Sequence, residues 1–164
     1  MTAVSKVWRQ GIVAGLLGAA GVAVWFLVVD LISGNPLYTP GVLGEAMLRV
    51  LGSSTVHGST FNVVAYTVVH VGAFIGVGIL ASALIEVSHR APHVTIGFLL
   101  FFVVFETGFY FIAMFLSEFD ALGRLNWYQI GGANVLASVL MGGYFWRRHP
   151  ELAADFKLSL DGRN

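Results

Sequence analysis

The stretch GIVAGLLGAAGVAVWFLVVDL, residues 11–31, decides the fold class, because it is a long and almost wholly apolar run. A helix rises about 1.5 Å per residue, so about 20 residues cross a hydrocarbon core roughly 30 Å thick. Three further apolar runs of similar length cover residues 62–85, 94–116 and 127–146. None of the four runs shows the strict alternation that is typical of strands in a membrane barrel.

The composition agrees with this interpretation. Of the 164 residues, 57% are hydrophobic and 11% are charged, whereas about a quarter are charged in an ordinary soluble domain. The sequence therefore predicts an all-α integral membrane protein with four transmembrane helices in an antiparallel bundle. We expect residues 1–164 to form this single domain, surrounded by the lipid bilayer of the cell membrane.

Basic residues indicate how the four predicted helices are oriented. Most of them fall on the side that carries both termini: Lys6, Arg9, Arg90, Arg147, Arg148, Lys157 and Arg163. Arg49 and Arg124 fall on the opposite side. Because cytoplasmic loops carry an excess of Lys and Arg, both termini are predicted to be cytoplasmic, with residues 150–164 as a tail. No nucleic-acid partner is expected.

The longest connection, residues 32–61, is then an outer loop. It contains TPGVLGEAMLRVLG, residues 39–52, in which Thr39 can cap a helix and Gly52 can end it. Glu45 and Arg49 are four residues apart, as in a helical ion pair. Apolar residues follow helical spacing on the other face: Val42, Leu43, Ala46, Met47, Val50 and Leu51. We predict a short amphipathic helix over residues 40–51, lying on the outer membrane surface or over the bundle mouth.

Small residues recur at every fourth position within the predicted membrane helices. They are Gly11, Gly15, Ala19 and Ala23 in the first, Gly72 and Gly76 in the second, and Ala133 and Ala137 in the last. Small residues at this spacing allow helix backbones to approach closely within lipid. These residues are therefore predicted helix-packing positions, either inside the bundle or, for the first helix, against another subunit.

One acidic residue stands out in FFVVFETGFYF, residues 101–111, where Glu106 is surrounded by aromatic side chains. A charge at this depth is costly, so Glu106 should face the bundle and have a partner. Counted along straight helices from the cytoplasmic side, Glu106, Asn134 and His70 lie about 20 Å deep, and Tyr110 lies close to His70. We predict a polar layer of His70, Glu106, Tyr110 and Asn134, which either holds helices together or binds a ligand or proton.

Cofactor and metal chemistry are weakly indicated. A haem with two axial histidines needs a second membrane-embedded histidine besides His70, so contact with a single tetrapyrrole or a quinone stays open. Glu86 and His89 have the Glu-x-x-His spacing of di-iron bundles, and His93 follows, but the second pair is absent and Pro92 interrupts the helix. The sequence requires no cofactor and predicts a polar loop there rather than a metal site.

The plan of four short helices with one buried glutamate is similar to that of the small multidrug resistance transporters. These work as dimers and use that glutamate to bind protons and cationic drugs. Their glutamate is on the first helix, whereas Glu106 is on the third predicted helix. That family also lacks the long outer loop of residues 32–61, and the chain is not assigned to the family.

Two functional interpretations remain. Hydrolase motifs and phosphate-binding loops are absent from the sequence, so we expect a non-enzymatic polytopic membrane protein. In the first interpretation it is an accessory or structural subunit that packs against other membrane subunits, for example in an energy-transducing complex. In the alternative, Glu106 and His70 form a small-molecule or proton binding or transport site, with a homodimer as one arrangement.

Overall fold

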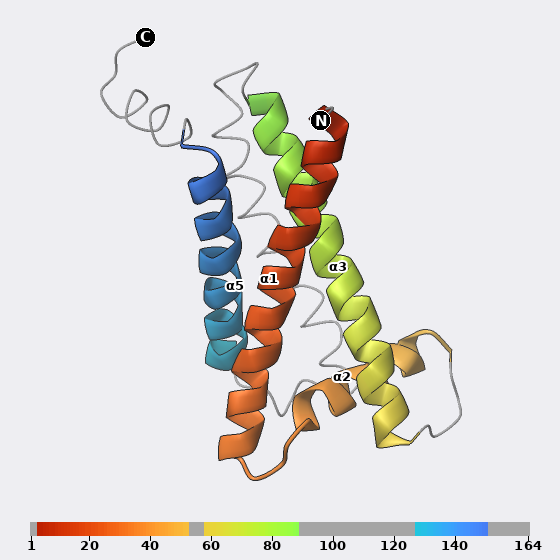
Figure 1. Ribbon diagram of the computed structural model, residues 1–164. Helices are drawn as coiled ribbons and strands as arrows, with labels where there is room; N and C mark the ends of the chain where they lie inside the picture. Colours follow the sequence, from red (N-terminus) through yellow and green to blue (C-terminus); the bar gives the residue numbers. More distant parts are fainter. Residues whose placement is uncertain (1–2, 53–57, 89–126, 151–164) are drawn as a thin grey trace.

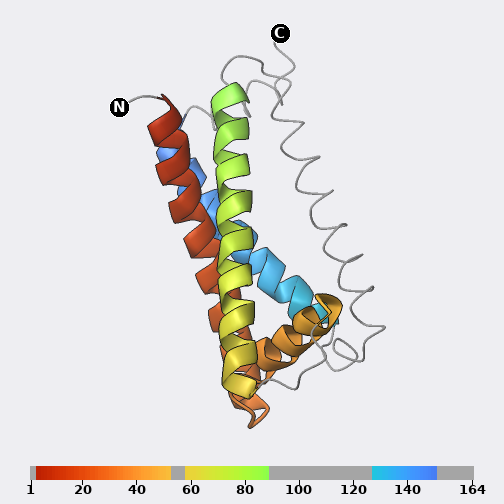
Figure 2. The ribbon, with the colours of Figure 1, turned by 90° about the vertical axis from the view of Figure 1, so that its right-hand side faces the viewer.

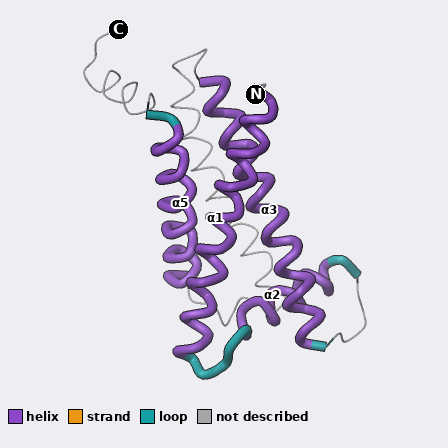
Figure 3. The backbone as a smooth tube through the Cα atoms, in the orientation of Figure 1, coloured by secondary structure: helices purple, strands orange, loops and turns teal. Residues whose placement is uncertain are grey.

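The computed structural model describes residues 3–52, 58–88 and 127–150 of the chain. These residues form four helices: α1 (Ala3–Ile32), α2 (Tyr38–Val50), α3 (Ser59–Ser88) and α5 (Trp127–Arg148). Helices and short loops make up the whole of this described part (Figure 3). The predicted helix over residues 94–116 and the tail beyond residue 150 lie outside it.

The two longest helices, α1 and α3, have 30 residues each, which corresponds to about 45 Å of helix. They contain the apolar runs 11–31 and 62–85 and extend beyond them at both ends. Among the described residues, Val4–Ile32 and Ser59–Val87 are the segments long and apolar enough to cross a membrane. The all-helical class is thus confirmed, with two candidate membrane-crossing helices.

Helix α1 lies between α3 and α5, and both of these helices run antiparallel to it (Figures 1 and 2). Helix α2 is short and lies across the end of α3, near the end of α1 (Figure 1). Helices α1 and α3 cross in the N-terminal half of α1 and then diverge towards α2 (Figure 1). The described helices therefore meet around α1 rather than around a central axis.

Glycines allow α1 and α3 to approach until their backbones touch. A Cβ atom added to Gly11, Gly15 or Gly78 would overlap the backbone of the opposite helix. At Gly78 the obstacle is the carbonyl oxygen of Gly11, and at Gly15 it is the carbonyl oxygen of Phe74. Such contacts give dense van der Waals packing, which holds helices together where lipid supplies no hydrophobic driving force.

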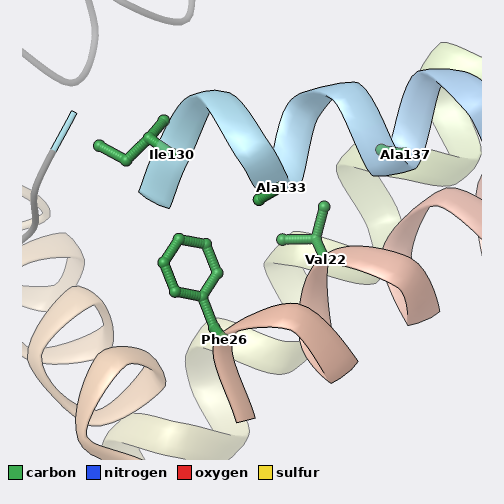
Figure 4. Close-up of a cluster of buried hydrophobic side chains, with 5 residues drawn as sticks. All are labelled: Val22, Phe26, Ile130, Ala133 and Ala137. Carbon is green, nitrogen blue, oxygen red and sulfur yellow. The ribbon is translucent and has the colours of Figure 1, made fainter. Parts of the chain in front are cut away.

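Helices α1 and α5 pack through an apolar cluster (Figure 4). Its buried members are Val22, Phe26, Ile130, Ala133 and Ala137. The Trp25 ring lies against Gly132, and its Nε1–H donates to the Gln129 carbonyl oxygen at 2.9 Å. This bond satisfies the indole N–H, which is needed when a Trp is removed from water.

A second cluster joins α1, α3 and α5 near the other end of the molecule. It consists of Ala14, Ala81, Ile85 and Phe145. Beyond it, the buried His149 Nε2 lies 3.0 Å from Gln10 Oε1. The amide oxygen can only accept, so this contact assigns the proton to Nε2.

Helix α2 follows the predicted pattern at its C-terminal end and differs at its start. Gly52 has a φ of 83° and its N–H donates to the Arg49 carbonyl oxygen, a typical glycine helix end. Glu45 and Arg49 form the predicted ion pair on the exposed face. The helix begins at Tyr38 with Leu37 as the capping position, so Thr39 lies in the first turn instead of capping.

The glycine contact between α1 and α3 predicts a strong effect of one added methyl group. Gly78→Ala should lower the free energy of unfolding in mixed detergent micelles by about 1–3 kcal/mol, because overpacking moves the two backbones apart. Gly76→Ala is the matched control, since Gly76 is exposed and no described atom lies within 4 Å of its added Cβ. Equal stability of the two variants would contradict the close packing.

Candidate functional site

A cavity of about 380 Å³ lies between α1, α2 and α3. Its α1 wall runs from Leu16 to Asp30 and its α3 wall from Val63 to Val71, and Leu37, Thr39 and Pro40 close the end near α2. Most of the lining is apolar, including the small side chains of Ala19, Ala20 and Ala23. Several wall residues are exposed, so the cavity is a groove that opens on the side of the bundle. We call it the α1–α3 groove.

Tyr66 and His70 supply polar atoms on the α3 wall. They are one helical turn apart and their rings stack, with centroids 5.3 Å apart. The Phe74 ring follows one turn later, 4.8 Å from the imidazole. Three aromatic side chains at i, i+4 and i+8 therefore form a continuous row along one face of α3.

The hydrogen bonds of this pair assign the tautomer of His70. Nε2 lies 3.4 Å from the Ala19 carbonyl oxygen of α1, which can only accept, so Nε2 carries the proton. Nδ1 is then an acceptor, and the Tyr66 hydroxyl, also at 3.4 Å, donates to it. Both distances exceed the usual 2.7–3.2 Å range, so the two bonds are weak.

Asp30 and Thr39 form a second polar pair at the α2 end of the groove. Thr39 N–H donates to Asp30 Oδ2 at 2.8 Å, and Thr39 Oγ1–H donates to Asp30 Oδ1 at 2.7 Å. Both residues are buried, with 3% and 1% of their surface exposed. The carboxylate thus takes the place of a side-chain cap for α2, where a negative charge is also favoured by the helix dipole.

Sequence reasoning missed Asp30, although a signal was present. It is an acidic residue inside the first apolar run, and the same argument that selected Glu106 applies to it. Its partner could not be read from the sequence, because the contact depends on the loop of residues 33–37. In that loop, Gly34 and Leu37 both have positive φ angles, 75° and 64°, which return the chain towards Asp30.

The structure describes two of the four residues of the predicted polar layer, His70 and Asn134. His70 lies in the α1–α3 groove, whereas Asn134 is half-buried on α5, on a helix that packs against α1. Glu106 and Tyr110 lie outside the described residues. Glu86 is in the last turn of α3, and His89 and His93 also lie outside the described part.

The predicted helix-packing residues take three kinds of position. Gly11 and Gly15 lie against α3, and Ala133 and Ala137 are buried between α1 and α5. Ala19 and Ala23 line the groove. Gly72 and Gly76 are exposed on α3, with no described atom within 4 Å of an added Cβ. Gly78, which is not among the predicted packing residues, is the α3 glycine that contacts α1.

No protein-family model, curated protein or solved structure matches this chain. Its function must therefore be argued from the groove and from the surface of the described helices.

The buried pair at the α2 end predicts a stability effect larger than that of an exposed ion pair. Asp30→Ala leaves two buried donors of Thr39 without an acceptor, which should cost about 3 kcal/mol of unfolding free energy. Glu45→Ala removes only the exposed bond to Arg49 and should cost less than about 1 kcal/mol.

A chemical reporter can show whether α2 detaches. The chain contains no cysteine, so Leu48→Cys adds one thiol on a half-buried position of α2. We expect Asp30→Ala to speed the reaction of this thiol with maleimide at least several-fold. An unchanged rate would mean that the Asp30–Thr39 pair does not hold α2 in place.

Proposed function

We propose that the chain is a four-span membrane protein that binds a small apolar molecule in the α1–α3 groove. In this proposal α1, residues 62–85 of α3, residues 94–116 and α5 cross the bilayer. Helix α2 lies at the outer surface, and both termini are cytoplasmic. The observation that carries the binding role is a largely apolar groove with the weakly bonded Tyr66–His70 pair on its wall.

The outer surface of the described helices supports the membrane location. Large apolar side chains point outward along their length; for example, Val24, Val68 and Val139 are 58%, 67% and 64% exposed. A large number of exposed apolar side chains is unfavourable in water and favourable in lipid. The beginning of α1 and the end of α5 lie at the same end of the bundle (Figure 1), and both carry basic residues, as the cytoplasmic side should.

A second function remains a candidate, that of an accessory subunit packed against other membrane proteins. The exposed positions of Gly72 and Gly76 favour it. These glycines are four residues apart on α3, and no described atom fills the space beside them. A helix of a partner could approach closely there. The groove gives the binding role more support, because it combines a volume with hydrogen-bonding groups.

The topology predicts opposite labelling of two single-cysteine variants. Leu51→Cys, on the outer side, should react with a membrane-impermeant maleimide in intact spheroplasts, because Leu51 is 73% exposed. Val4→Cys, 67% exposed at the start of α1, should react only after the membrane is permeabilised. Labelling of both residues from the outside would contradict the proposed arrangement.

Filling the groove should remove a bound small molecule. Ala23 is an exposed wall residue, so Ala23→Phe adds a ring to the groove without replacing a buried side chain. Native mass spectrometry of the gently extracted protein should show a small-molecule adduct on the wild type and on Val28→Phe, but not on Ala23→Phe. Val28 is the control because it is exposed on α1 outside the groove lining.

The same measurement separates the two candidate functions. An adduct of low mass that depends on Ala23 supports the groove as a binding site. Co-extracted protein subunits without such an adduct would favour the accessory role and contradict the binding role.

A further inference from the structure

We infer that the α1–α3 groove holds a neutral single-chain lipid whose carbonyl or hydroxyl oxygen hydrogen-bonds to Tyr66 and His70. This inference rests on the proposed binding function and adds the chemical class of the ligand. It follows from three features of the groove: its proportions, the depth of its polar pair and the different state of its two polar ends.

The groove is long relative to its volume. From Leu16 to Asp30 its α1 wall extends about 21 Å at 1.5 Å per residue. One group of the size of a water molecule or a methylene needs about 10–15 Å³ of cavity volume, so the volume of about 380 Å³ accommodates roughly two to three dozen such groups. A groove of this length and volume suits an extended acyl or prenyl chain.

The polar pair lies deep in the membrane of the proposed arrangement. His70 is three residues from the middle of the candidate span Ser59–Val87, which is about 5 Å along the helix axis. A charged group at this depth would be costly to place. A phosphate or ammonium headgroup therefore belongs at the membrane surface, and the group that reaches Tyr66 and His70 is neutral.

The two polar ends of the groove differ in how well they are satisfied. At the α2 end, Asp30 receives both hydroxyl and backbone donors of Thr39 at 2.7 and 2.8 Å. At the deeper end, the contacts of Tyr66 and His70 are 3.4 Å long. A ligand oxygen gains more where protein bonds are weak, because it replaces little. Tyr66 O–H can donate to a carbonyl, and His70 Nδ1 can accept from a hydroxyl.

The ligand class can be tested with three probes that share a similar chain. They are decylubiquinone, which offers carbonyls; dodecanol, which offers a hydroxyl; and dodecyltrimethylammonium, which is charged. Each is titrated into the detergent-solubilised full chain, and the saturable rise in the thermal unfolding midpoint gives an apparent Kd. At least one neutral probe should bind at least tenfold more tightly than the ammonium. Of the two neutral probes, the one that binds more tightly shows whether the groove prefers a carbonyl or a hydroxyl oxygen.

Substitutions test which side chains contact the bound probe. Tyr66→Phe or His70→Ala should raise the Kd of the preferred neutral probe by about fivefold, the effect of one lost hydrogen bond. Ala23→Phe should abolish its saturable binding, and Val28→Phe should leave the Kd unchanged. The unfolding midpoint without ligand shows for each variant that the fold is intact. If Ala23→Phe fails this control, it is replaced by Ala20→Phe, another exposed wall position.

The outcomes separate the two levels of the proposal. Binding that depends on Ala23 but is equal for neutral and charged probes, or indifferent to Tyr66 and His70, overturns the ligand class and leaves the binding function standing. Absence of saturable binding for every probe, together with no adduct in native mass spectrometry, overturns both.

Discussion

The rest of the described structure depends on the backbone contact between α1 and α3. Gly11, Gly15 and Gly78 place the two helices so close that a single added Cβ would overlap main-chain atoms. Two straight helices that touch at one point and cross at an angle must separate away from it. The two helices separate towards α2 (Figure 1), and the groove lies there, with Leu37, Thr39 and Pro40 at its end near α2. Packing at one end of the pair thus makes a cavity at the other.

The polar groups that line the groove differ in the length of their hydrogen bonds, which are short for Asp30 and long for His70. The Asp30 carboxylate is enclosed and fully engaged with Thr39, so its main effect is to fix α2 against the end of α1. The His70 imidazole has partners at a distance where hydrogen bonds contribute little. A buried polar group with short bonds stabilises one arrangement, whereas one with long bonds can exchange them for those of another molecule at small cost.

Much of the fold could be read from the sequence because the relevant signals are local. Apolar run length gave the helices around residues 11–31, 62–85 and 127–146, and the spacing of Glu45 and Arg49 gave the ion pair of α2. The face of α3 that contacts α1 could not be predicted, since α3 carries small residues on more than one face and Gly78 lies about 200° around the helix from Gly76. In the structure, Gly78 is in contact with α1, whereas Gly72 and Gly76 are exposed.

The candidate site shows the same division between local and non-local information. His70 could be selected from its position inside an apolar helix, but its neighbours Tyr66 and Ala19 follow only from the turn of α3 and the crossing of α1. The groove itself is a property of three helices together. Asp30 was detectable as an acidic residue in an apolar run, yet its bond to Thr39 depends on the unusual backbone of Leu37.

In the proposed membrane arrangement, the lateral opening of the α1–α3 groove would determine which concentration governs its occupancy. If α1 and α3 cross the bilayer as proposed, a molecule that enters between them exchanges with the surrounding lipid and does not cross the aqueous phase. The relevant concentration is then the mole fraction of the molecule in the bilayer. An affinity expressed relative to the aqueous concentration would also include the partition coefficient of the molecule between water and lipid. A modest preference over bulk phospholipid would suffice to keep such a groove filled, and diffusion within two dimensions would set the rate at which its contents turn over.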